Sequence, residues 1–133
     1  MTVQLSDLVR NARLNSIETV IGATAIMRIR TGAQPASCTA GDTGTILAEL
    51  TLPADWMAAA AGGIASATGT WVDASANASG TADHFRIYNG AGTVCGLQGD
   101  VGVAAEDLVV DNDVFAAGQS FTVTSFVLTD GNA

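Results

Sequence analysis

Residues 4–22 carry apolar side chains at steps of three and four positions, the spacing of one face of an α-helix. The stripe consists of Leu5, Leu8, Val9, Ala12, Ile17, Val20 and Ile21. Thr2 or Ser6 can cap the start of such a helix, and Gly22 stands where a C-terminal cap is expected. The pattern predicts an amphipathic helix whose stripe packs on the domain or serves as a docking arm for a partner.

After residue 24 the pattern changes to alternation and to short apolar runs, both typical of β-strands. The predicted strands are 26–30, 45–52, 68–73, 82–88, 93–98, one or two within 101–110, and 121–128. Asn89–Gly92 predicts a hairpin turn, because glycine readily supplies positive φ. Residues 32–44 and 74–81 are predicted loops, and the Ala-rich stretch 57–63 fits either a helical turn or a strand.

Roughly five to eight short strands at regular spacing, with no βαβ alternation, indicate a mainly β domain. We predict an antiparallel β-sandwich or jelly-roll-like barrel with one N-terminal helix. We expect residues 1–133 to form one domain, with the helix at 4–22 and the β-sandwich at 24–133. The expected core is Ile26, Ile46, Leu50, Trp71, Phe85, Ile87, Phe121, Val123 and Phe126. Truncating a buried aromatic there, Trp71 or Phe121, should cost roughly 3–5 kcal/mol.

The amino-acid composition indicates which kinds of partner the chain is expected to bind. The net charge is −8, and only 14% of the residues are charged. Such an acidic chain repels phosphate backbones and anionic lipids, so we expect neither nucleic-acid nor membrane binding. No stretch reaches the roughly 20 apolar residues of a membrane span. The weakly charged, Thr- and Ala-rich composition suits close packing against protein neighbours.

Cys38 and Cys95 are the only cysteines. No signal-peptide pattern is visible, so we expect synthesis in a reducing cytoplasm, where both remain thiols. Whether the two meet in space is left open by the sequence.

Candidate chemistry is sparse. The single histidine, His84, follows Asp83, but neighbouring residues of a strand point to opposite faces and do not form a catalytic pair. Asp107, Asp111 and Asp113 lack the residue order of a calcium-binding loop, so solvated turn residues are expected. We therefore predict no catalytic, cofactor-binding or metal-binding residues, and a protein that is not an enzyme.

Several segments, in this order, resemble a family of small virion structural proteins encoded by tailed bacteriophages and prophages. They are LVRNARL (8–14), IE (17–18), IRTGAQP (29–35), TILAELTL (45–52), GTW (69–71), GTA (80–82), FRI (85–87) and VLTDGNA (127–133). The resemblance covers nearly the whole chain and carries no catalytic signature. It implies a β-rich component of the phage particle and leaves head or tail open.

A low-charge surface repeated on a symmetric shell suits a capsid decoration (cement) protein, because repetition multiplies a modest affinity per contact. We therefore expect a protein that binds the outer head lattice and stabilises it. The expected partner is the major capsid protein, with self-association on the particle. The expected location is the capsid exterior of the virion, after synthesis in the bacterial host cytoplasm.

The expected contacts come from the N-terminal helix and the loops at 32–44 and 74–81. Within or beside them, Arg10, Arg13, Arg28 and Arg30 are predicted to meet acidic groups of the capsid protein. Reversing the charge of Arg10 and Arg13 is then expected to weaken binding without unfolding the domain. The alternatives are a tail- or fibre-associated virion protein and a β-sandwich module that binds a ligand or carbohydrate.

Overall fold

The computed structural model describes residues 3–131 of the chain. One helix, α1 (Asp7–Ile21), precedes all the strands. The strands are β1 (Ile26–Arg30), β2 (Ile46–Thr51), β3 (Ile64–Ser66), β4 (Val72–Asp73), β5 (Gly80–Thr81), β6 (His84–Tyr88), β7 (Cys95–Gly102), β8 (Leu108–Val110), β9 (Val114–Phe115) and β10 (Phe121–Thr129).

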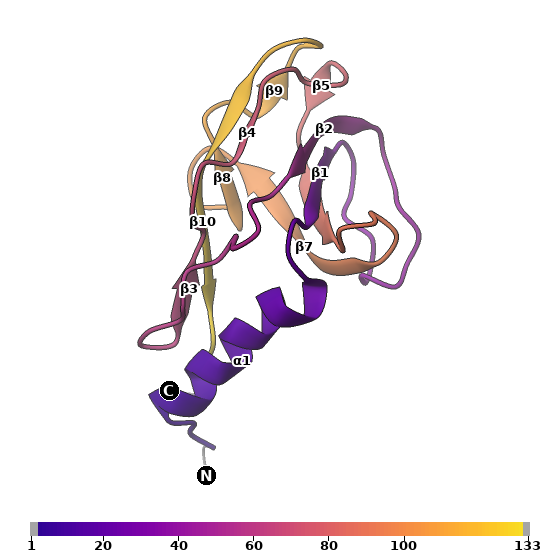
Figure 1. Cartoon of the computed structure of the whole chain (residues 1–133). Helices are drawn as coiled ribbons and strands as arrows, with labels where there is room; N and C mark the ends of the chain where they lie inside the picture. The colour runs from indigo at the N-terminus through magenta and orange to yellow at the C-terminus, as the bar shows by residue number, and fades with distance from the viewer. Residues whose placement is uncertain (1–2, 132–133) are drawn as a thin grey trace.

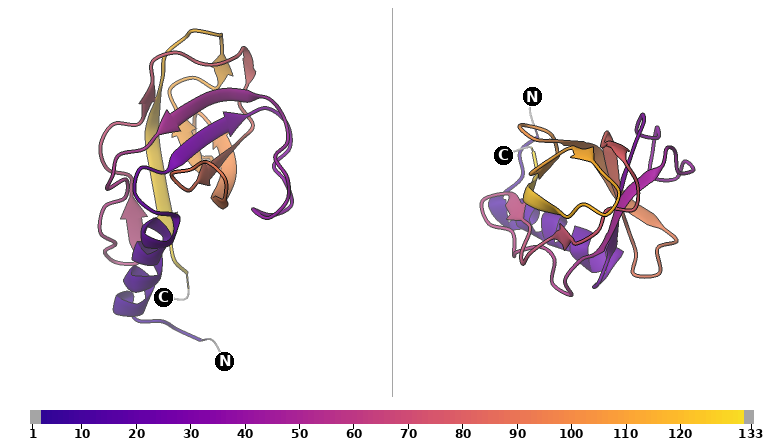
Figure 2. Two further views of the ribbon diagram at one scale, coloured as in Figure 1. Left: turned by 45° about the vertical axis from the view of Figure 1, so that its right-hand side comes forward. Right: turned by 90° about the horizontal axis from the view of Figure 1, so that it is seen from above.

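The main sheet has eight strands in the order β2-β1-β6-β7-β8-β10-β3, with β4 also paired to β10. A second small sheet joins β5 to β9. The main sheet curls around its own core like a half-barrel, and α1 projects beside β3 and the end of β10 (Figures 1 and 2). The mainly β, sandwich- or barrel-like class with one N-terminal helix is therefore confirmed. Pairing is antiparallel except between β7 and β8, which run parallel over two residues.

The predicted hairpin around Asn89–Gly92 is present between β6 and β7, and the Asn89 side chain accepts hydrogen bonds from the backbone N–H groups of Thr93 and Val94. Three very short strands, β3, β5 and β9, were not predicted, because two or three residues are too few to establish a period. The stretch 57–63 is neither a helix nor a strand, but it makes isolated bridges at Met57 and Ala61.

Helix α1 begins at the predicted cap Ser6, whose hydroxyl accepts from the Val9 N–H at 3.3 Å, and ends at Gly22. Thr2, the other candidate cap, lies outside the described residues. The predicted apolar stripe is divided: Ile21 is buried and Ile17 packs against the core, whereas Leu8 and Val20 face outward. The helix buries Arg10, Leu14 and Ile21. Leu8 and Val20 are 80% and 82% exposed.

Polar side chains attach α1 to the chain segment 57–63. Asn11, Asn15 and Glu18 accept hydrogen bonds from the backbone N–H groups of Gly63, Ala60 and Met57 respectively. These three residues follow one helical face, and their partners recur every third residue along the neighbouring segment. The helix thus satisfies backbone donors that an extended segment would otherwise leave open to another chain.

The core combines the inner face of the curled sheet with a row of aromatic rings. Trp71 lies 6.3 Å from Trp56 and 5.5 Å from Phe126, and Phe126 lies 5.6 Å from Phe85, measured between ring centroids. Of the expected core residues, six are buried: Leu50, Trp71, Phe85, Ile87, Phe121 and Phe126. Ile26, Ile46 and Val123 are only partly buried.

The inner face of β1 is made by Met27 and Ile29, both completely buried, and not by Ile26 as predicted. In β2 it is Leu47 that is fully buried, in place of Ile46. Ile26 and both arginines of β1 share the opposite face of the strand.

Candidate functional site

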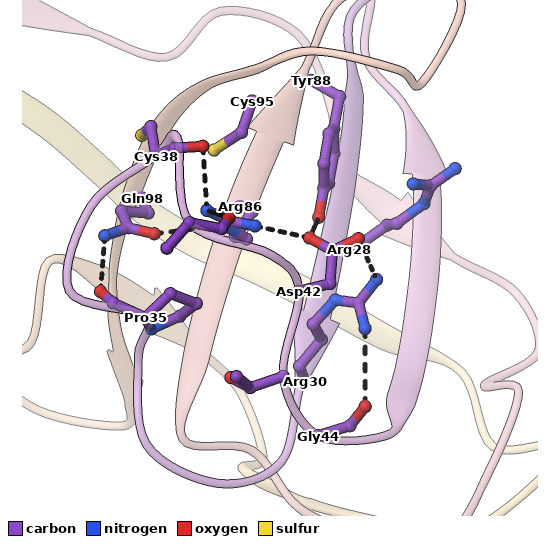
Figure 3. A network of polar contacts seen from close by, with 12 residues as sticks. Arg28, Arg30, Pro35, Cys38, Asp42, Gly44, Arg86, Tyr88, Cys95 and Gln98 are labelled. Atoms are coloured by element: carbon purple, nitrogen blue, oxygen red, sulfur yellow. Dashed lines mark hydrogen bonds and ion pairs between the residues drawn. The ribbon is translucent and has the colours of Figure 1, made fainter.

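The most elaborate polar arrangement lies under the loop 31–45, which connects β1 to β2. This loop lies against the face of the sheet that carries Arg30, Arg86 and Tyr88 (Figure 3). The sheet register places Arg28 of β1 opposite Arg86 of β6, and Arg86 opposite Gln98 of β7. Alternation along three neighbouring strands thus gathers polar side chains on one face, while apolar ones point into the core.

Asp42, in the loop, connects these side chains. Its Oδ1 accepts a hydrogen bond from Nη1 of Arg86 at 2.5 Å and another from the Tyr88 hydroxyl. Its Oδ2 lies 3.2 Å from Nη2 of Arg30. Both guanidinium groups are almost completely buried, whereas the carboxylate is 39% exposed. One partly exposed carboxylate is therefore the ion-pair partner of two buried guanidinium groups.

Arg86 also holds the loop through its backbone. Its Nη2 donates to the carbonyl oxygens of Ser37, Cys38 and Ala40 at 3.0, 3.1 and 3.0 Å. Its Nε donates to Oε1 of Gln98 at 3.1 Å, and Gln98 donates in turn to the Pro35 carbonyl. A planar group with five donors suits this task, since it can bind a carboxylate and several carbonyls together. The loop is thereby attached along most of its length.

The electrostatics keep Asp42 ionised. Burial alone would raise the pKa of Asp42, but hydrogen bonds from Tyr88 and Arg86 and the charges of Arg30 and Arg86 lower it below its ordinary value. Burial and the hydrogen bond to Asp42 raise the pKa of Tyr88, which keeps the hydroxyl as a donor. Since both carboxylate oxygens are engaged by cations or the phenol, the group acts as a structural anion.

Arg28 lies at the margin of this face. Its Nε is 2.6 Å from Oε2 of Glu49, and its guanidinium lies over the Tyr88 ring, 4.6 Å from the centroid. The hydrogen bond that Arg28 donates to the Glu49 carboxylate raises the pKa of Arg28. Because Glu49 is 43% exposed, this pair should contribute little to stability.

A pocket of about 200 Å³ opens beside the network and is lined by Cys38, Asp42, Arg86, Tyr88 and Cys95 among others. Figure 3 shows the two cysteine side chains next to each other at one end of the network. Both are free thiols and partly buried. Burial, with a further contribution from the neighbouring Cys38 thiol, raises the pKa of Cys95 to about 11. The fold therefore answers the question that the sequence left open: the two cysteines meet.

The four arginines predicted as partner contacts have different environments. Arg30 belongs to the network just described. Arg28 is paired with Glu49, and Arg13, whose side chain is 56% exposed, is paired with Asp130 at 3.1 Å. Arg10 is buried, and its Nε and Nη2 donate to the Asp130 carbonyl at 3.0 and 2.8 Å. Arg10 and Arg30 are thus used within the fold, and Arg13 is the most accessible of the four.

The burial of Arg10 corrects one expectation. Reversing its charge would place a carboxylate against the Asp130 carbonyl in a buried site and would destabilise the domain. The combined reversal of Arg10 and Arg13 therefore cannot separate binding from folding, whereas a change at Arg13 alone can.

Alanine substitutions at the neighbouring Gly62 and Gly63 can test whether the buried Arg10 side chain stabilises the domain. A methyl group at Gly63 would overlap with the Arg10 guanidinium, whereas one at Gly62 would meet no atom within 4 Å. Both residues have positive φ, 75° and 60°, so both alanine substitutions carry backbone strain. We expect Gly62→Ala to cost about 1 kcal/mol and Gly63→Ala about 2 kcal/mol in chemical unfolding. Equal losses would show that the Arg10 contact does not matter.

His84, Asp107 and Asp111 use their side chains in hydrogen bonds within the fold. His84 is 1% exposed, and its Nδ1 lies 2.8 Å from the Gly32 carbonyl, while its Nε2 has no hydrogen-bond partner. Asp107 pairs with the backbone N–H of Asp100, and Asp111 with that of Thr122. Among residues 3–131, no three His, Cys, Asp or Glu side chains are placed to hold a metal ion together.

A second surface feature is the outward face of α1, formed by Leu8, Ala12, Ser16, Thr19 and Val20. All five residues are exposed and none is charged. Within the described part of the chain, no helix is long and apolar enough to cross a membrane. The face therefore offers a small uncharged surface, flanked by Arg13, on the side of the helix opposite the core.

Sequence reasoning missed Asp42, Arg86, Tyr88 and Gln98. A usable signal existed for two of them, since Arg86 and Tyr88 alternate with the predicted core residues Phe85 and Ile87. No pattern pointed to Asp42, which lies in an irregular loop. Comparison of the chain with protein-family models, with curated proteins and with solved structures finds no match.

Proposed function

We propose that this protein is a structural component of a tailed-phage virion, a decoration (cement) protein that binds the outer head lattice through its N-terminal helix. The proposal combines the ordered sequence resemblance with two features of the fold. The arginines of the β body are paired within it, and α1 presents a face that the domain itself does not cover. Its partner would be the major capsid protein, and the location the capsid exterior.

The outward face of α1 is the observation that carries the proposal. Leu8 and Val20 are 80% and 82% exposed at opposite ends of the face. Burying one such side chain contributes about 1.5–3 kcal/mol, so a single site would bind weakly. On a symmetric shell, many identical weak contacts act together, and the uncharged face avoids the repulsion that a net charge of −8 would otherwise create.

The test is binding of purified protein to phage particles that lack it. Leu8→Asp and Val20→Asp should each lower the amount that co-sediments with particles by roughly tenfold or more, because each loses a contact of about 1.4 kcal/mol or more. Both residues are exposed, so the melting temperature should change little.

A matched control is Val94→Asp, which changes an exposed valine (61%) in the β6–β7 hairpin, outside α1. This variant should bind like the parent protein. If all three variants bind equally well, α1 is not the contact. If the parent protein does not bind the particles at all, the decoration role itself is refuted.

A further inference from the structure

Cys38 and Cys95 lie where the loop 31–45 meets the sheet, and we propose that they form a redox-controlled disulfide that fastens the loop to β7. The inference concerns a modification site and does not depend on the proposed function. Both side chains line the same pocket, and both belong to parts of the chain that the polar network holds in place.

The positions of the two cysteines are fixed from both sides. On the loop, the carbonyl of Cys38 itself accepts a hydrogen bond from Nη2 of Arg86 at 3.1 Å. On the sheet, Cys95 pairs in register with Tyr88, and its thiol lies 3.4 Å from the Leu97 carbonyl. Arg86 and Tyr88 both bind Asp42 of the same loop. The network thus brings two distant stretches of chain to one place before any covalent bond forms.

The chemistry requires an oxidant, and a small disulfide such as oxidised glutathione supplies it. One cysteine thiolate attacks the glutathione disulfide, which releases one glutathione and leaves a mixed disulfide on the protein. The second cysteine thiolate then attacks the protein sulfur of that mixed disulfide and releases the second glutathione. In total, two protein thiols lose two electrons and two protons, and one glutathione disulfide becomes two glutathione thiols.

The reaction should be slow in a reducing compartment and faster in an oxidising one. A reducing cytoplasm keeps both thiols reduced, whereas an extracellular medium allows the disulfide to persist. Because the pKa of Cys95 is about 11, that thiol is protonated at neutral pH, and mildly alkaline conditions should speed the reaction.

Trypsin gives a direct readout. The chain has no lysine, and Arg86 is the only arginine between the two cysteines. Cleavage after arginine therefore places Cys38 in the peptide 31–86 and Cys95 in the peptide 87–133. After the folded protein is treated with oxidised glutathione, the two peptides should appear as one species in mass spectrometry and separate on reduction. The intact protein should be lighter by two hydrogen atoms.

Three results would overturn the proposal. One is two separate peptides, each carrying glutathione, and another is two thiols that both remain open to alkylation. The third is a melting temperature that does not change on oxidation. The crosslinked protein should melt roughly 5–15 °C higher than the reduced protein, and the Cys38→Ser variant should show no such increase under the same treatment. An unchanged melting temperature would mean that the bond does not fasten the loop.

Discussion

Replacing Trp71 with alanine should lower the free energy of unfolding by about 3–5 kcal/mol. Trp71 is 3% exposed and contacts the rings of both Trp56 and Phe126, so its loss opens a cavity in the middle of the aromatic row. Its Nε1 also donates to the Thr68 carbonyl at 3.0 Å, a bond that alanine cannot make. Urea unfolding followed by circular dichroism measures the change.

The control for this prediction is Val103→Ala, at a valine that is 53% exposed. That variant should lose less than about 0.5 kcal/mol. A small loss in Trp71→Ala, comparable to the control, would mean that the curled sheet does not enclose Trp71 as described.

Replacing Asp42 with asparagine should cost about 3 kcal/mol. The change keeps the shape of the side chain but removes the anion that serves Arg30 and Arg86, whose side chains are 8% and 2% exposed. Breaking a buried ion pair typically costs about 3–5 kcal/mol, and the partial exposure of Asp42 reduces that figure. Glu49→Gln provides the matched control, because it removes the partly exposed partner of Arg28 and should cost less than about 1 kcal/mol.

The difference in stability between the parent protein and Asp42→Asn should also depend on pH. The pKa of Asp42 in the folded protein lies below its ordinary value of 3.8. The stabilisation from its charge is therefore complete above the unfolded pKa and is lost as the pH falls through the folded one. The difference in unfolding free energy between the parent protein and Asp42→Asn should thus be largest near neutral pH and shrink in acid. A difference that stays constant into strong acid would mean that the carboxylate charge does not stabilise the loop.

The class of fold could be predicted because it depends on local periods. The alternation in 26–30 and 82–88 and the hairpin at Asn89–Gly92 each specify a strand or turn without knowledge of the rest of the chain. Which face of a strand points inward is different, because it depends on what covers the other face. In β1, Arg28 and Arg30 share a face with Ile26, and the loop 31–45 covers that face, so Met27 and Ile29 are left to form the core.

The helix illustrates the same limit. Its apolar stripe was expected either to pack on the domain or to serve as a docking arm, and the structure divides it. Ile21 is buried, whereas Leu8 and Val20 lie outside. Arg10, Asn11 and Asn15 also lie on the contacting side. The contacting side follows from the backbone donors of segment 57–63, which offer hydrogen bonds to polar side chains. A hydrophobic stripe identifies a helix but cannot distinguish a face that packs on its own domain from one that is free for a partner.

The polar network around Asp42 could not be predicted either, because its members are far apart in the sequence. Asp42 lies 44 residues before Arg86 in the chain, and nothing in the local composition of an irregular loop marks one aspartate as the partner of a buried arginine. The meeting of Cys38 and Cys95 depends on that same long-range placement. Only the arrangement of the sheet brings these residues together.

The most direct test of the proposed role is the number of copies of this protein in purified phage particles from its source, measured by quantitative mass spectrometry against the major capsid protein. The decoration role predicts a ratio near one per capsid subunit, or one per small symmetric cluster of subunits. A handful of copies per particle would contradict lattice binding and indicate the tail or a single vertex. Complete absence from the particle would contradict a virion role altogether and favour a ligand-binding module.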